Sequence, residues 1–258
     1  MQYGQIKPQR PIRSILITRP LNQADHLVSA ITESGLQTIL LPIFRIEPCI
    51  DLNTRQKILH FNQYDIVIVT SKNAASVLIE MLDTYWPQLP ARQIFFAIGS
   101  STARYLAQHH IKAEVPEAMH SEGLIRMILT SQKHLNKVII CKGVGGRNIL
   151  EQTLGQKADS LEVMELYRRV LLNHPVPDLI TKFKQADLLI CTSEQTLMQM
   201  QYLADKVQIP IKHLPIMVSS RRLAERAATM QFTYIYLSDN ATDKSLVISL
   251  QRLLRKNT

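Results

Sequence analysis

The chain has 258 residues, of which 46% are hydrophobic and 6% aromatic, and its 8 glycines and 12 prolines show no periodic spacing. This composition supports a folded core and excludes collagen-like and low-complexity chains. The 30 Lys and Arg residues exceed the 21 Asp and Glu residues, and the resulting net charge of +9 favours polyanionic ligands such as nucleic acid, acidic lipid or a small polycarboxylate.

The cysteines and the N-terminal segment indicate a cytoplasmic protein. Cys49, Cys141 and Cys191 are widely spaced and form no C-x-x-C pair, so neither a disulfide scaffold nor a zinc ribbon is expected. Residues 1–12 are polar and basic and lack the apolar stretch of a signal peptide, which predicts a loose tail. No apolar run reaches the roughly 20 residues that a membrane span needs.

Short β-branched runs alternate with amphipathic helical stretches along the whole chain. The pattern predicts a strand at 15–17, a helix from about 22 to 34, and a second strand at 38–41. Each further strand is followed by a turn and a helix, and these strands are expected at 65–69, 94–98, 138–140, 188–190 and 216–218. Two extended segments, 42–48 and 163–172, are interpreted as connectors. The alternation predicts an α/β fold with parallel sheets that helices cover on both faces.

The predicted elements repeat at a nearly constant spacing. Corresponding positions recur after 122, 120 and 123 residues, in the pairs Asp65 and Asp187, Gly99 and Ser219, and Ile15 and Val138. Three near-equal offsets predict a duplicated α/β half, one for each of two similar domains. The sequence leaves open whether each half folds as a contiguous block or exchanges its first unit with the other.

Ser or Thr is expected at the N-cap position of the helix that follows each predicted strand. A hydroxyl at a helix N-cap accepts a hydrogen bond from a free backbone N–H, and the remaining N–H groups attract an anion together with the helix dipole. One such junction alone is an ordinary cap. The carboxyl ends of parallel strands share one edge of a sheet, where ligands bind. Six junctions in two facing domains are therefore expected to surround one cleft with hydrogen-bond donors.

The segment 141–148, CKGVGGRN, is a candidate anion-binding turn. Its glycines allow backbone N–H groups to point at an anion, and Lys142 and Arg147 add positive charge. The segment is not a P-loop, which ends in Gly-Lys-Ser/Thr. It is not the dinucleotide fingerprint either, because Asn148 stands where the third glycine is required. A plain tight turn ahead of a helix is the alternative interpretation.

Metal and nucleophilic chemistry find little support in the sequence. The eight histidines form no i, i+4 pair and have no Cys partner at ligand spacing, so no metal site is expected. No G-x-S-x-G nucleophile elbow occurs. The sequence leaves open a Ser-His-Asp or Cys-His triad whose members lie far apart along the chain. Tyr167 lies in the second extended segment, where its phenol could donate a proton to a leaving hydroxyl. Packing within the fold is the alternative role for Tyr167.

An ordered series of motifs resembles the uroporphyrinogen-III synthase family and extends over residues 15–254. The series consists of ILITRP (15–20), ILLPIFRIEP (39–48), YDIVIVTSKNA (64–74), FAIGSSTARYL (96–106), CKGVGGRNILEQTL (141–154), MELYRRV (164–170), DLLICTSEQTL (187–197) and PIMVSSRRLAERA (215–227). The resemblance implies two similar α/β domains, each a parallel sheet flanked by helices, joined by a two-stranded connector. It also implies that 13–43 plus 171–258 form a discontinuous domain and 48–165 form the other.

The chemistry that the resemblance implies is that of a lyase of porphyrin and haem biosynthesis. Such an enzyme cyclises hydroxymethylbilane, a linear tetrapyrrole polycarboxylate, to uroporphyrinogen III with inversion of ring D and loss of water. The substrate is held in the cleft between the domains. Catalysis comes from orientation of the substrate and from electrostatic stabilisation, and no cofactor or metal is used. The implied catalytic residue is Tyr167. The family's hydroxyl-bearing turn residues fall on Ser71, Thr102 and Ser193, and its Gly-Gly-Arg turn falls on Gly145, Gly146 and Arg147. The expected substrate-binding set also includes Arg19, Asn73, Ser101, Ser219 and Arg222.

The sequence departs from the family pattern at two places. Residues 219–222, SSRR, stand where many relatives carry a glycine turn with threonine, and there Arg222 would replace a hydroxyl contact with a charged one. Asn73 stands where some relatives carry arginine. Neither change argues against the activity.

Two other classes of function are weighed against this one. A non-catalytic two-domain module would bind a small polyanion without turnover. Nucleic-acid binding would need a clustered basic face with stacking aromatics, whereas Lys and Arg are scattered here and aromatics are few. We therefore expect a cytoplasmic monomer that binds neither nucleic acid nor a membrane. The resemblance leaves open a direct handover of substrate from hydroxymethylbilane synthase.

Overall fold

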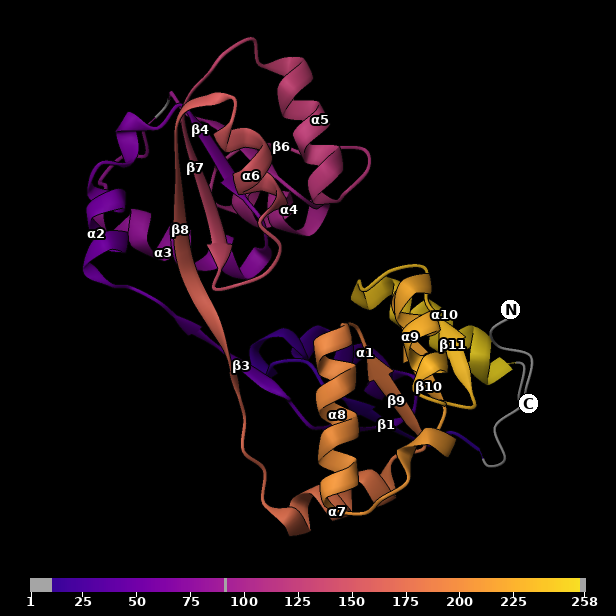
Figure 1. Cartoon of the computed structure of the whole chain (residues 1–258). Helices are drawn as coiled ribbons and strands as arrows, with labels where there is room; N and C mark the ends of the chain where they lie inside the picture. The colour runs from indigo at the N-terminus through magenta and orange to yellow at the C-terminus, as the bar shows by residue number, and fades with distance from the viewer. Residues whose placement is uncertain (1–10, 91, 256–258) are drawn as a thin grey trace. The chain divides into compact units, whose positions relative to one another are not determined.

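The computed structural model describes residues 11–90 and 92–255, which divide into two compact units. Unit 1 contains residues 1–45 and 170–258, and unit 2 contains residues 46–169. Figure 1 shows the chain passing twice from one unit to the other. The predicted domain ranges, 13–43 plus 171–258 and 48–165, lie inside these units, with boundaries a few residues away.

Unit 2 is built on a mixed sheet in the order β3-β8-β7-β4-β5-β6. Its strands are β3 (Phe44–Pro48), β4 (Ile66–Val69), β5 (Ile94–Ala97), β6 (Ala113–Glu114), β7 (Leu135–Gly143) and β8 (Ala158–Leu171). The pairs from β8 to β6 are parallel. The backbone bonds of Cys49 to Leu166 and of Leu172 to Ile43 show that β3 runs antiparallel to β8 at the edge.

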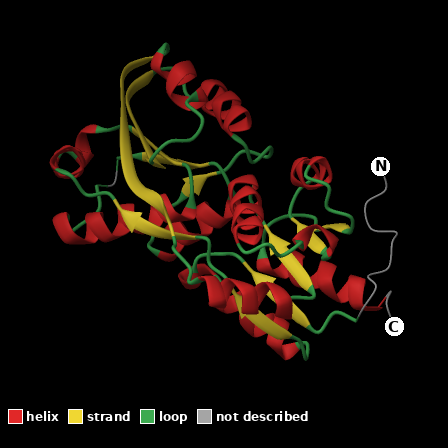
Figure 2. Cartoon of the chain, turned by 60° about the horizontal axis from the view of Figure 1, so that its bottom comes forward, coloured by secondary structure: helices red, strands yellow, loops and turns green. Residues whose placement is uncertain are grey.

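Helices cover both faces of this sheet (Figure 2). They are α2 (Leu52–Leu59), α3 (Lys72–Tyr85), α4 (Ser100–Gln108), α5 (Ser121–Ser131) and α6 (Ile149–Gly155), with a 3₁₀ turn at Phe61–Gln63. The central strand β4 is a continuous apolar run, IVIV, buried on both faces as expected of a parallel strand between two helical layers. Val67 and Val69 contribute to one core cluster, and Ile66 and Ile68 contribute to the other.

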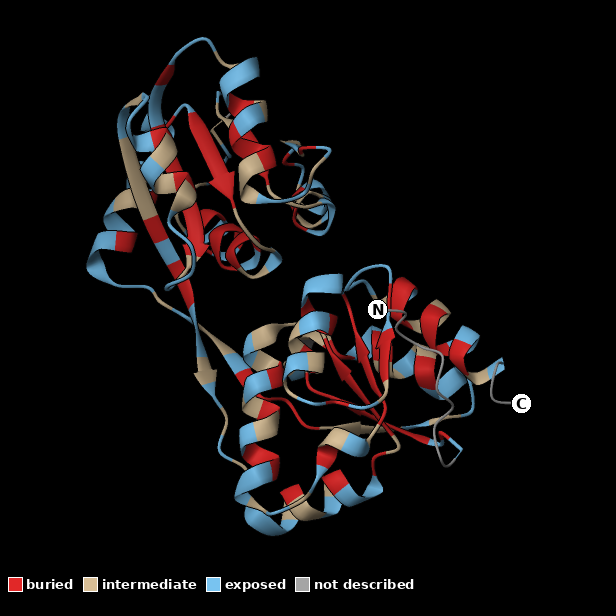
Figure 3. Cartoon of the chain, turned by 45° about the vertical axis from the view of Figure 1, so that its right-hand side comes forward, coloured by how far each residue is buried: buried red, intermediate tan, exposed pale blue. Residues whose placement is uncertain are grey.

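Unit 1 has the same architecture. In the part that the structure describes, five parallel strands are ordered β11-β10-β9-β1-β2. They are β1 (Ser14–Ile17), β2 (Gln37–Leu40), β9 (Leu188–Cys191), β10 (Ile216–Val218) and β11 (Ile235–Leu237). The helices are α1 (Asp25–Glu33), α7 (Val176–Gln185), α8 (Glu194–Lys206), α9 (Arg221–Thr229) and α10 (Asp243–Arg255), with 3₁₀ turns at Leu21–Gln23 and Ile211–His213. Figure 3 shows that the strands are largely buried, whereas the helices expose their outer faces.

The predicted repeat is exchanged between the units. Matching β4, β5 and β6 with β9, β10 and β11, and β7-α6-β8 with β1-α1-β2, gives the two sheets the same strand order. The first strand-helix-strand segment of each sequence repeat therefore lies in the sheet of the other repeat. Asp65 accepts a bond from Lys137 N–H at 3.1 Å. Asp187 accepts the equivalent bonds from Arg13 and Ser14 at 3.0 and 2.9 Å. Each aspartate thus links a central strand to the exchanged strand beside it.

Two further expectations concern the N-terminal tail and the lack of a membrane-spanning segment. Of the predicted loose tail 1–12, residues 1–10 lie outside the described residues, whereas Ile12 is buried in the core of unit 1. The tail prediction is therefore wrong for Ile12, because its apolar side chain packs with the residues of β1. None of the helices described by the structure is long and apolar enough to cross a membrane.

Candidate active site

The carboxyl edge of the unit 2 sheet carries most of the predicted site residues. Ser71 follows β4, Ser101 and Thr102 lie in the first turn of α4 after β5, and Gly145 follows β7. Tyr167 lies near the end of β8. Parallel strands bring these positions to one edge of the sheet, where α/β proteins bind their ligands.

A direct contact joins Ser71 and Tyr167. Ser71 is the N-cap of α3, and its Oγ accepts a hydrogen bond from Ala74 N–H at 3.2 Å. The same oxygen lies 3.1 Å from Tyr167 Oη. Tyr167 is only 5% exposed, and its ring belongs to an apolar core cluster. The packing role and the proposed chemical role of Tyr167 are therefore compatible, because the ring is buried while the hydroxyl reaches a helix N-terminus, which stabilises negative charge.

Gly143 provides the space for the Tyr167 ring. A Cβ atom at Gly143 would lie 2.6 Å from Tyr167 Cζ and 2.9 Å from each Cε. The two residues are register partners at an irregularity between β7 and β8, and Val144 N–H donates to the carbonyl oxygen of Tyr167 at 2.7 Å. Sequence reasoning missed this role of Gly143. It begins the predicted glycine turn, but only the strand register places it under the tyrosine.

The glycine turn itself has the predicted backbone freedom. Gly145 and Gly146 have φ of +77° and +88°, in the left-handed region that favours glycine. The backbone N–H of Gly145 donates to Glu165 Oε1 at 3.3 Å. The turn therefore directs a backbone donor at a carboxylate, and in this structure that carboxylate belongs to β8.

The cations near the turn have carboxylate partners. Lys142 Nζ lies 2.5 Å from Glu151 Oε1 and 3.2 Å from Asn148 Oδ1, and its side chain is 10% exposed. Arg147 lies 3.4 Å from Glu122 and stays largely exposed. The pKa of Glu122 is below its usual value because its own backbone N–H, then His120 and then Arg147, stabilise the carboxylate. Lys142 therefore fastens the turn to α6, whereas Arg147 is accessible to a ligand.

The expectation of a hydroxyl cap at every junction is wrong for half of the junctions. Ser71, Ser193 and Ser220 cap α3, α8 and α9 through their side chains. Gly99 is the N-cap of α4 and has no side chain that can cap. The caps of α1 and α6 are Ala24 and Asn148, and neither makes a side-chain cap bond in the described structure. A 3₁₀ turn after Pro20 separates α1 from β1, and the longer glycine turn separates α6 from β7.

The other predicted residues of unit 2 are placed as follows. Thr102 is 3% exposed, and its N–H donates to Gly99 O at 3.1 Å. Ser101 is exposed on the first turn of α4, and Asn73 is partly buried on the first turn of α3. Ser101 and Asn73 are thus the side chains of this group that solvent reaches.

Unit 1 presents a second set at the carboxyl edge of its own sheet. Ser193 Oγ accepts from Thr196 N–H at 3.2 Å and lies 2.7 Å from Thr196 Oγ1. Ser219 is buried and donates to Thr192 O at 3.3 Å, so the junctions after β9 and β10 adjoin. The cap of α9 is the next residue, Ser220, and Arg222 is exposed on the first turn of that helix.

Arg19 has a structural partner. Its guanidinium pairs with the carboxylate of Asp243 and donates to the carbonyl oxygen of Ala241, at the start of α10. Arg19 therefore holds the turn after β1 to the start of α10. To bind substrate as predicted, its guanidinium would have to exchange this ion pair for one with the substrate.

Neither of the two buried cysteines is suited to act as a nucleophile, and the described residues form no metal site. Burial raises the pKa of the Cys141 thiol, and it raises that of the Cys191 thiol to about 12. Neither thiol is therefore ionised near neutral pH, as a nucleophile would require. Among the residues that the structure describes, no group of three or more His, Cys, Asp or Glu could hold a metal ion.

Comparison with known proteins gives one consistent family. The family model of uroporphyrinogen-III synthase HemD matches residues 25–248. Uroporphyrinogen-III synthase of Escherichia coli strain K12 is 26% identical over 250 residues, which cover 92% of this chain and 100% of that protein. The Proteus mirabilis protein of the same name is 27% identical over 201 residues, which cover 75% of this chain and 98% of that protein.

Solved structures share the fold. A mutant uroporphyrinogen III synthase of Thermus thermophilus superposes with a TM-score of 0.65 at 14% identity, covering 95% of this chain and 99% of that one. The uroporphyrinogen-III synthetase of Helicobacter pylori 26695 gives 0.59 at 15% identity, covering 93% and 100%. The resemblance seen in the ordered motifs is confirmed, and the chain belongs to the uroporphyrinogen-III synthase family.

Proposed function

We propose that this protein cyclises hydroxymethylbilane to uroporphyrinogen III, with inversion of ring D and loss of water. The observation that carries the proposal is the match of the family model over residues 25–248. The contact between Tyr167 and Ser71 at the carboxyl edge of unit 2 supports it, because it supplies a proton donor at a helix N-terminus. A module that only binds a polyanion is not favoured, since the matched relatives bear the name of an enzyme.

In this proposal Tyr167 assists the departure of the terminal hydroxyl. The phenol donates its proton, the carbon–oxygen bond breaks, and water leaves. Electrons from the pyrrole nitrogen complete the azafulvene, and loss of the pyrrole N–H proton leaves that intermediate neutral. The substituted carbon of ring D then attacks the electrophilic methylene carbon, which gives a spiro intermediate. The older bond from that carbon to the methylene of ring C breaks, and this methylene bonds to the unsubstituted α-carbon of ring D. Loss of the proton from that carbon restores the pyrrole and completes the inversion. Ser71 positions the phenol as the phenolic proton moves.

The carboxylates of the substrate would bind at helix N-termini and at exposed cations. In unit 2 we assign them to the first turns of α3 and α4, to the glycine turn and to Arg147. In unit 1 we assign them to the first turns of α8 and α9 and to Arg222. The left-handed backbone of Gly145 and Gly146 supports this assignment, because it lets backbone N–H groups of the turn point at an anion. The N–H of Gly145 would exchange its bond with Glu165 for one with the substrate. We assign Arg19 to the support of its turn, since Asp243 pairs with it.

A coupled assay tests the proposal. Hydroxymethylbilane is generated by its own synthase, this protein is added, and the oxidised products are separated into isomers I and III. Uncatalysed closure gives isomer I, so formation of isomer III in proportion to the added protein is expected. Isomer I alone, from protein shown to be folded, would refute the proposed activity.

We also propose that the protein acts as a monomer and that it receives hydroxymethylbilane from the synthase that makes it. The presence of separate core clusters in each unit supports the first point, because neither unit needs a second copy to complete its core. Spontaneous closure to isomer I supports the second, because a free intermediate is lost. Sedimentation of the active protein tests the first point. The isomer ratio as both enzymes are diluted together tests the second.

A further inference from the structure

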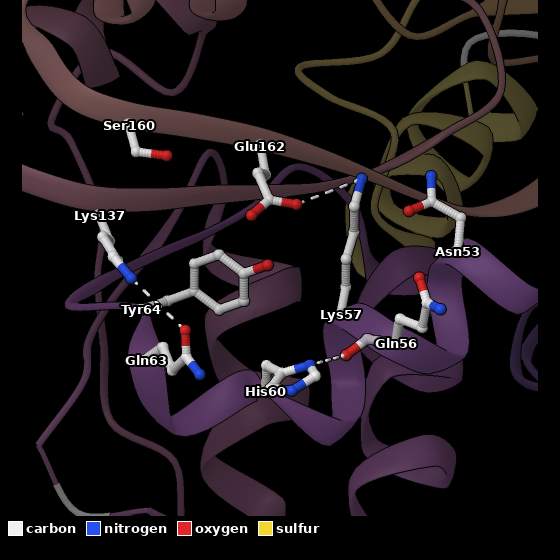
Figure 4. Close-up of a pocket in the computed structure, with 9 residues that line it drawn as sticks. All are labelled: Asn53, Gln56, Lys57, His60, Gln63, Tyr64, Lys137, Ser160 and Glu162. Atoms are coloured by element: carbon white, nitrogen blue, oxygen red, sulfur yellow. Dashed lines mark hydrogen bonds and ion pairs between the residues drawn. The ribbon is translucent and has the colours of Figure 1, made fainter.

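A pocket of about 320 Å³ lies in unit 2, away from the candidate active site. We call it the amino-edge pocket. It is lined by Asn53, Gln56, Lys57, His60, Gln63, Tyr64, Lys137, Ser160 and Glu162 (Figure 4). Glu162 precedes Tyr167 by five positions on β8, which is about 16 Å along a strand. The pocket therefore lies toward the amino ends of the strands whose carboxyl ends carry Tyr167 and the glycine turn.

The sheet face behind the pocket changes from apolar to polar along β7 and β8. Cys141 pairs with Met164 in the buried core, whereas Ile139 pairs with Glu162 one step toward the amino ends. Lys137 pairs with Ser160 one step further. Lys137 and Ser160 are exposed and Glu162 is partly buried, so this end of the face reaches solvent and presents three polar side chains to the pocket.

The opposite wall of the pocket is polar as well. Helix α2 contributes Asn53, Gln56 and Lys57, and its C-cap residue contributes the His60 side chain. Figure 4 shows these side chains around the same space as Glu162 and Lys137. Thr54 and Ile58 are the residues of α2 that are buried. Both walls of the pocket therefore offer hydrogen-bonding groups to a ligand.

The two lysines lie on opposite sides of the pocket (Figure 4), and Lys57 is paired with Glu162. Lys57 Nζ donates to Val163 O at 2.7 Å and lies 3.6 Å from Glu162 Oε2, and the Lys57 side chain is 15% exposed. Tyr64 is buried, and burial, followed by the charge of Glu162 and a hydrogen bond to it, raises the pKa of its phenol. Lys137 lies toward the other end and contacts Gln63 Oε1 at 3.4 Å. Two lysines against one glutamate leave the lining with a positive balance.

We propose that the amino-edge pocket binds a small hydroxylated anion, namely a polyol that carries a carboxylate or a phosphate. Its charged group is placed at Lys137 and Ser160, which are neighbours across β7 and β8. Its hydroxyls are placed at Glu162 and at the amide side chains, because carboxylates accept and amides both donate and accept hydrogen bonds. A volume of about 320 Å³ suits a ligand of this size.

Calorimetric titration of the whole protein tests this proposal. D-gluconate and D-glucose 6-phosphate are the two hydroxylated anions, and inorganic phosphate and D-glucose carry the charge or the hydroxyls alone. We expect saturable binding of at least one hydroxylated anion, at least tenfold tighter than either partial probe. Binding of gluconate alone identifies a carboxylate site, and binding of the sugar phosphate alone identifies a phosphate site.

Three variants make the test specific to the pocket. Lys137→Met is expected to weaken binding by about tenfold or more, since a hydrogen bond to a charged group is lost. Ser160→Ala is expected to weaken it several-fold. Lys133→Met removes an exposed lysine that is not among the pocket residues and is expected to leave binding unchanged. Circular dichroism of each variant confirms that it is folded.

Three results would overturn the proposal. They are the absence of saturable binding by both hydroxylated anions, undiminished binding by folded Lys137→Met, and binding of inorganic phosphate as tight as that of the sugar phosphate. No tetrapyrrole is present in these titrations, so their outcome is independent of whether the protein forms isomer III.

Discussion

At the residue scale, the contact between Gly143 and Tyr167 explains why a glycine precedes the Gly145-Gly146 turn. An added methyl group 2.6 Å from Tyr167 Cζ cannot be accommodated unless the ring or the β7–β8 pairing moves. We expect Gly143→Ala to cost about 1–3 kcal/mol of unfolding free energy. It is also expected to lower the rate of isomer III formation by at least tenfold, because Tyr167 Oη leaves Ser71. Urea denaturation and the coupled assay measure the two effects.

Gly155→Ala is the matched control for this substitution. Apart from its chain neighbours and the nearby backbone of its own helix, no described heavy atom lies within 4 Å of the position that a Cβ at Gly155 would take. Stability and rate should both stay near those of the unchanged protein. Equal effects of the two alanine substitutions would show that steric contact with Tyr167 is not the cause.

The phenol hydroxyl can be removed while the ring keeps its place. Tyr167→Phe deletes the contact with Ser71 and retains the buried ring. We expect isomer III to form on the order of 100-fold more slowly, as when a general acid is lost. Unfolding free energy should change by about 1 kcal/mol or less. Nearly full turnover by this variant would remove the tyrosine from the mechanism.

The residue types of the site could be predicted better than their partners. Ser71 stands directly after an apolar run, and a serine there is a strong N-cap pattern. The partner of Arg19 could not be predicted, because Asp243 lies 224 residues away and only the fold brings the two together. Lys142 was likewise expected to face an anion, whereas Glu151, on the helix that follows, neutralises it.

At the scale of elements, α3 and α8 are corresponding helices with serine caps. Comparing them separates the capping role of Ser71 from its role as the partner of Tyr167. Ser193→Ala removes a cap from α8, and Ser71→Ala removes a cap from α3 together with the partner of Tyr167. Each is expected to cost about 1 kcal/mol of stability. Thermal or urea unfolding gives the cost of the cap. In the coupled assay, Ser71→Ala should also change the pH profile of the rate, as expected when the position of the phenol is lost.

The start of α2 should respond to acid. Asp51 caps this helix, and the backbone N–H of Thr54 is the main reason why the pKa of the Asp51 carboxyl is below its usual value. A lowered folded-state pKa contributes stability that is present above the unfolded value of about 3.9 and is lost as the pH falls through the folded value. Asp51→Asn keeps a capping side chain but cannot titrate.

Urea unfolding from about pH 6 to about pH 2.5 measures this contribution. The unchanged protein is expected to lose more stability than Asp51→Asn across that interval. Parallel losses in the two proteins would contradict the assignment of the lowered pKa to the cap.

Most strands with a buried apolar run could be predicted, and two edge strands could not. The runs 65–69, 188–190 and 216–218 each overlap an observed strand. β6 has two residues, too few to show a period, and pairs with β5. β11 is as long as β10, with which it pairs, and sequence reasoning missed it. The helix expected from about residue 22 begins at Asp25, because a 3₁₀ turn comes first.

At the scale of the whole molecule, the exchange of repeats determines which fragments can fold. Fragment 46–169 contains every strand from β4 to β7, nearly all of β8 and both of its core clusters. Fragment 14–131 spans the first sequence repeat, but it lacks β7, the neighbour of β4, and β9, the neighbour of β1. We expect the first fragment to unfold cooperatively in urea and the second to show no cooperative transition. A folded 14–131 fragment would refute this account.

The duplication could be predicted from the repeat alone, whereas the exchange is implied only by the family resemblance. Offsets of 120–123 residues show that two halves share a pattern. The pattern is satisfied equally when β1 pairs with β4 or with β9, because both central strands are short apolar runs buried on both faces. The connections after β2 and β8 decide which pairing forms. Their path depends on how the two sheets assemble, and the apolar pattern of the strands does not encode it.

The separation between Ser14 and Asp187 along the chain has a consequence for the order of synthesis. β1 is buried between β2 and β9, and its first residue bonds to a residue 173 positions later. At about 5–20 residues per second, roughly 10 to 35 s pass between the synthesis of β1 and that of β9. Unit 2 has all its strands once Leu171 has emerged, so it can fold first. β1 is synthesised before the other described strands of its sheet, and one of its edges stays unpaired until β9 has been synthesised.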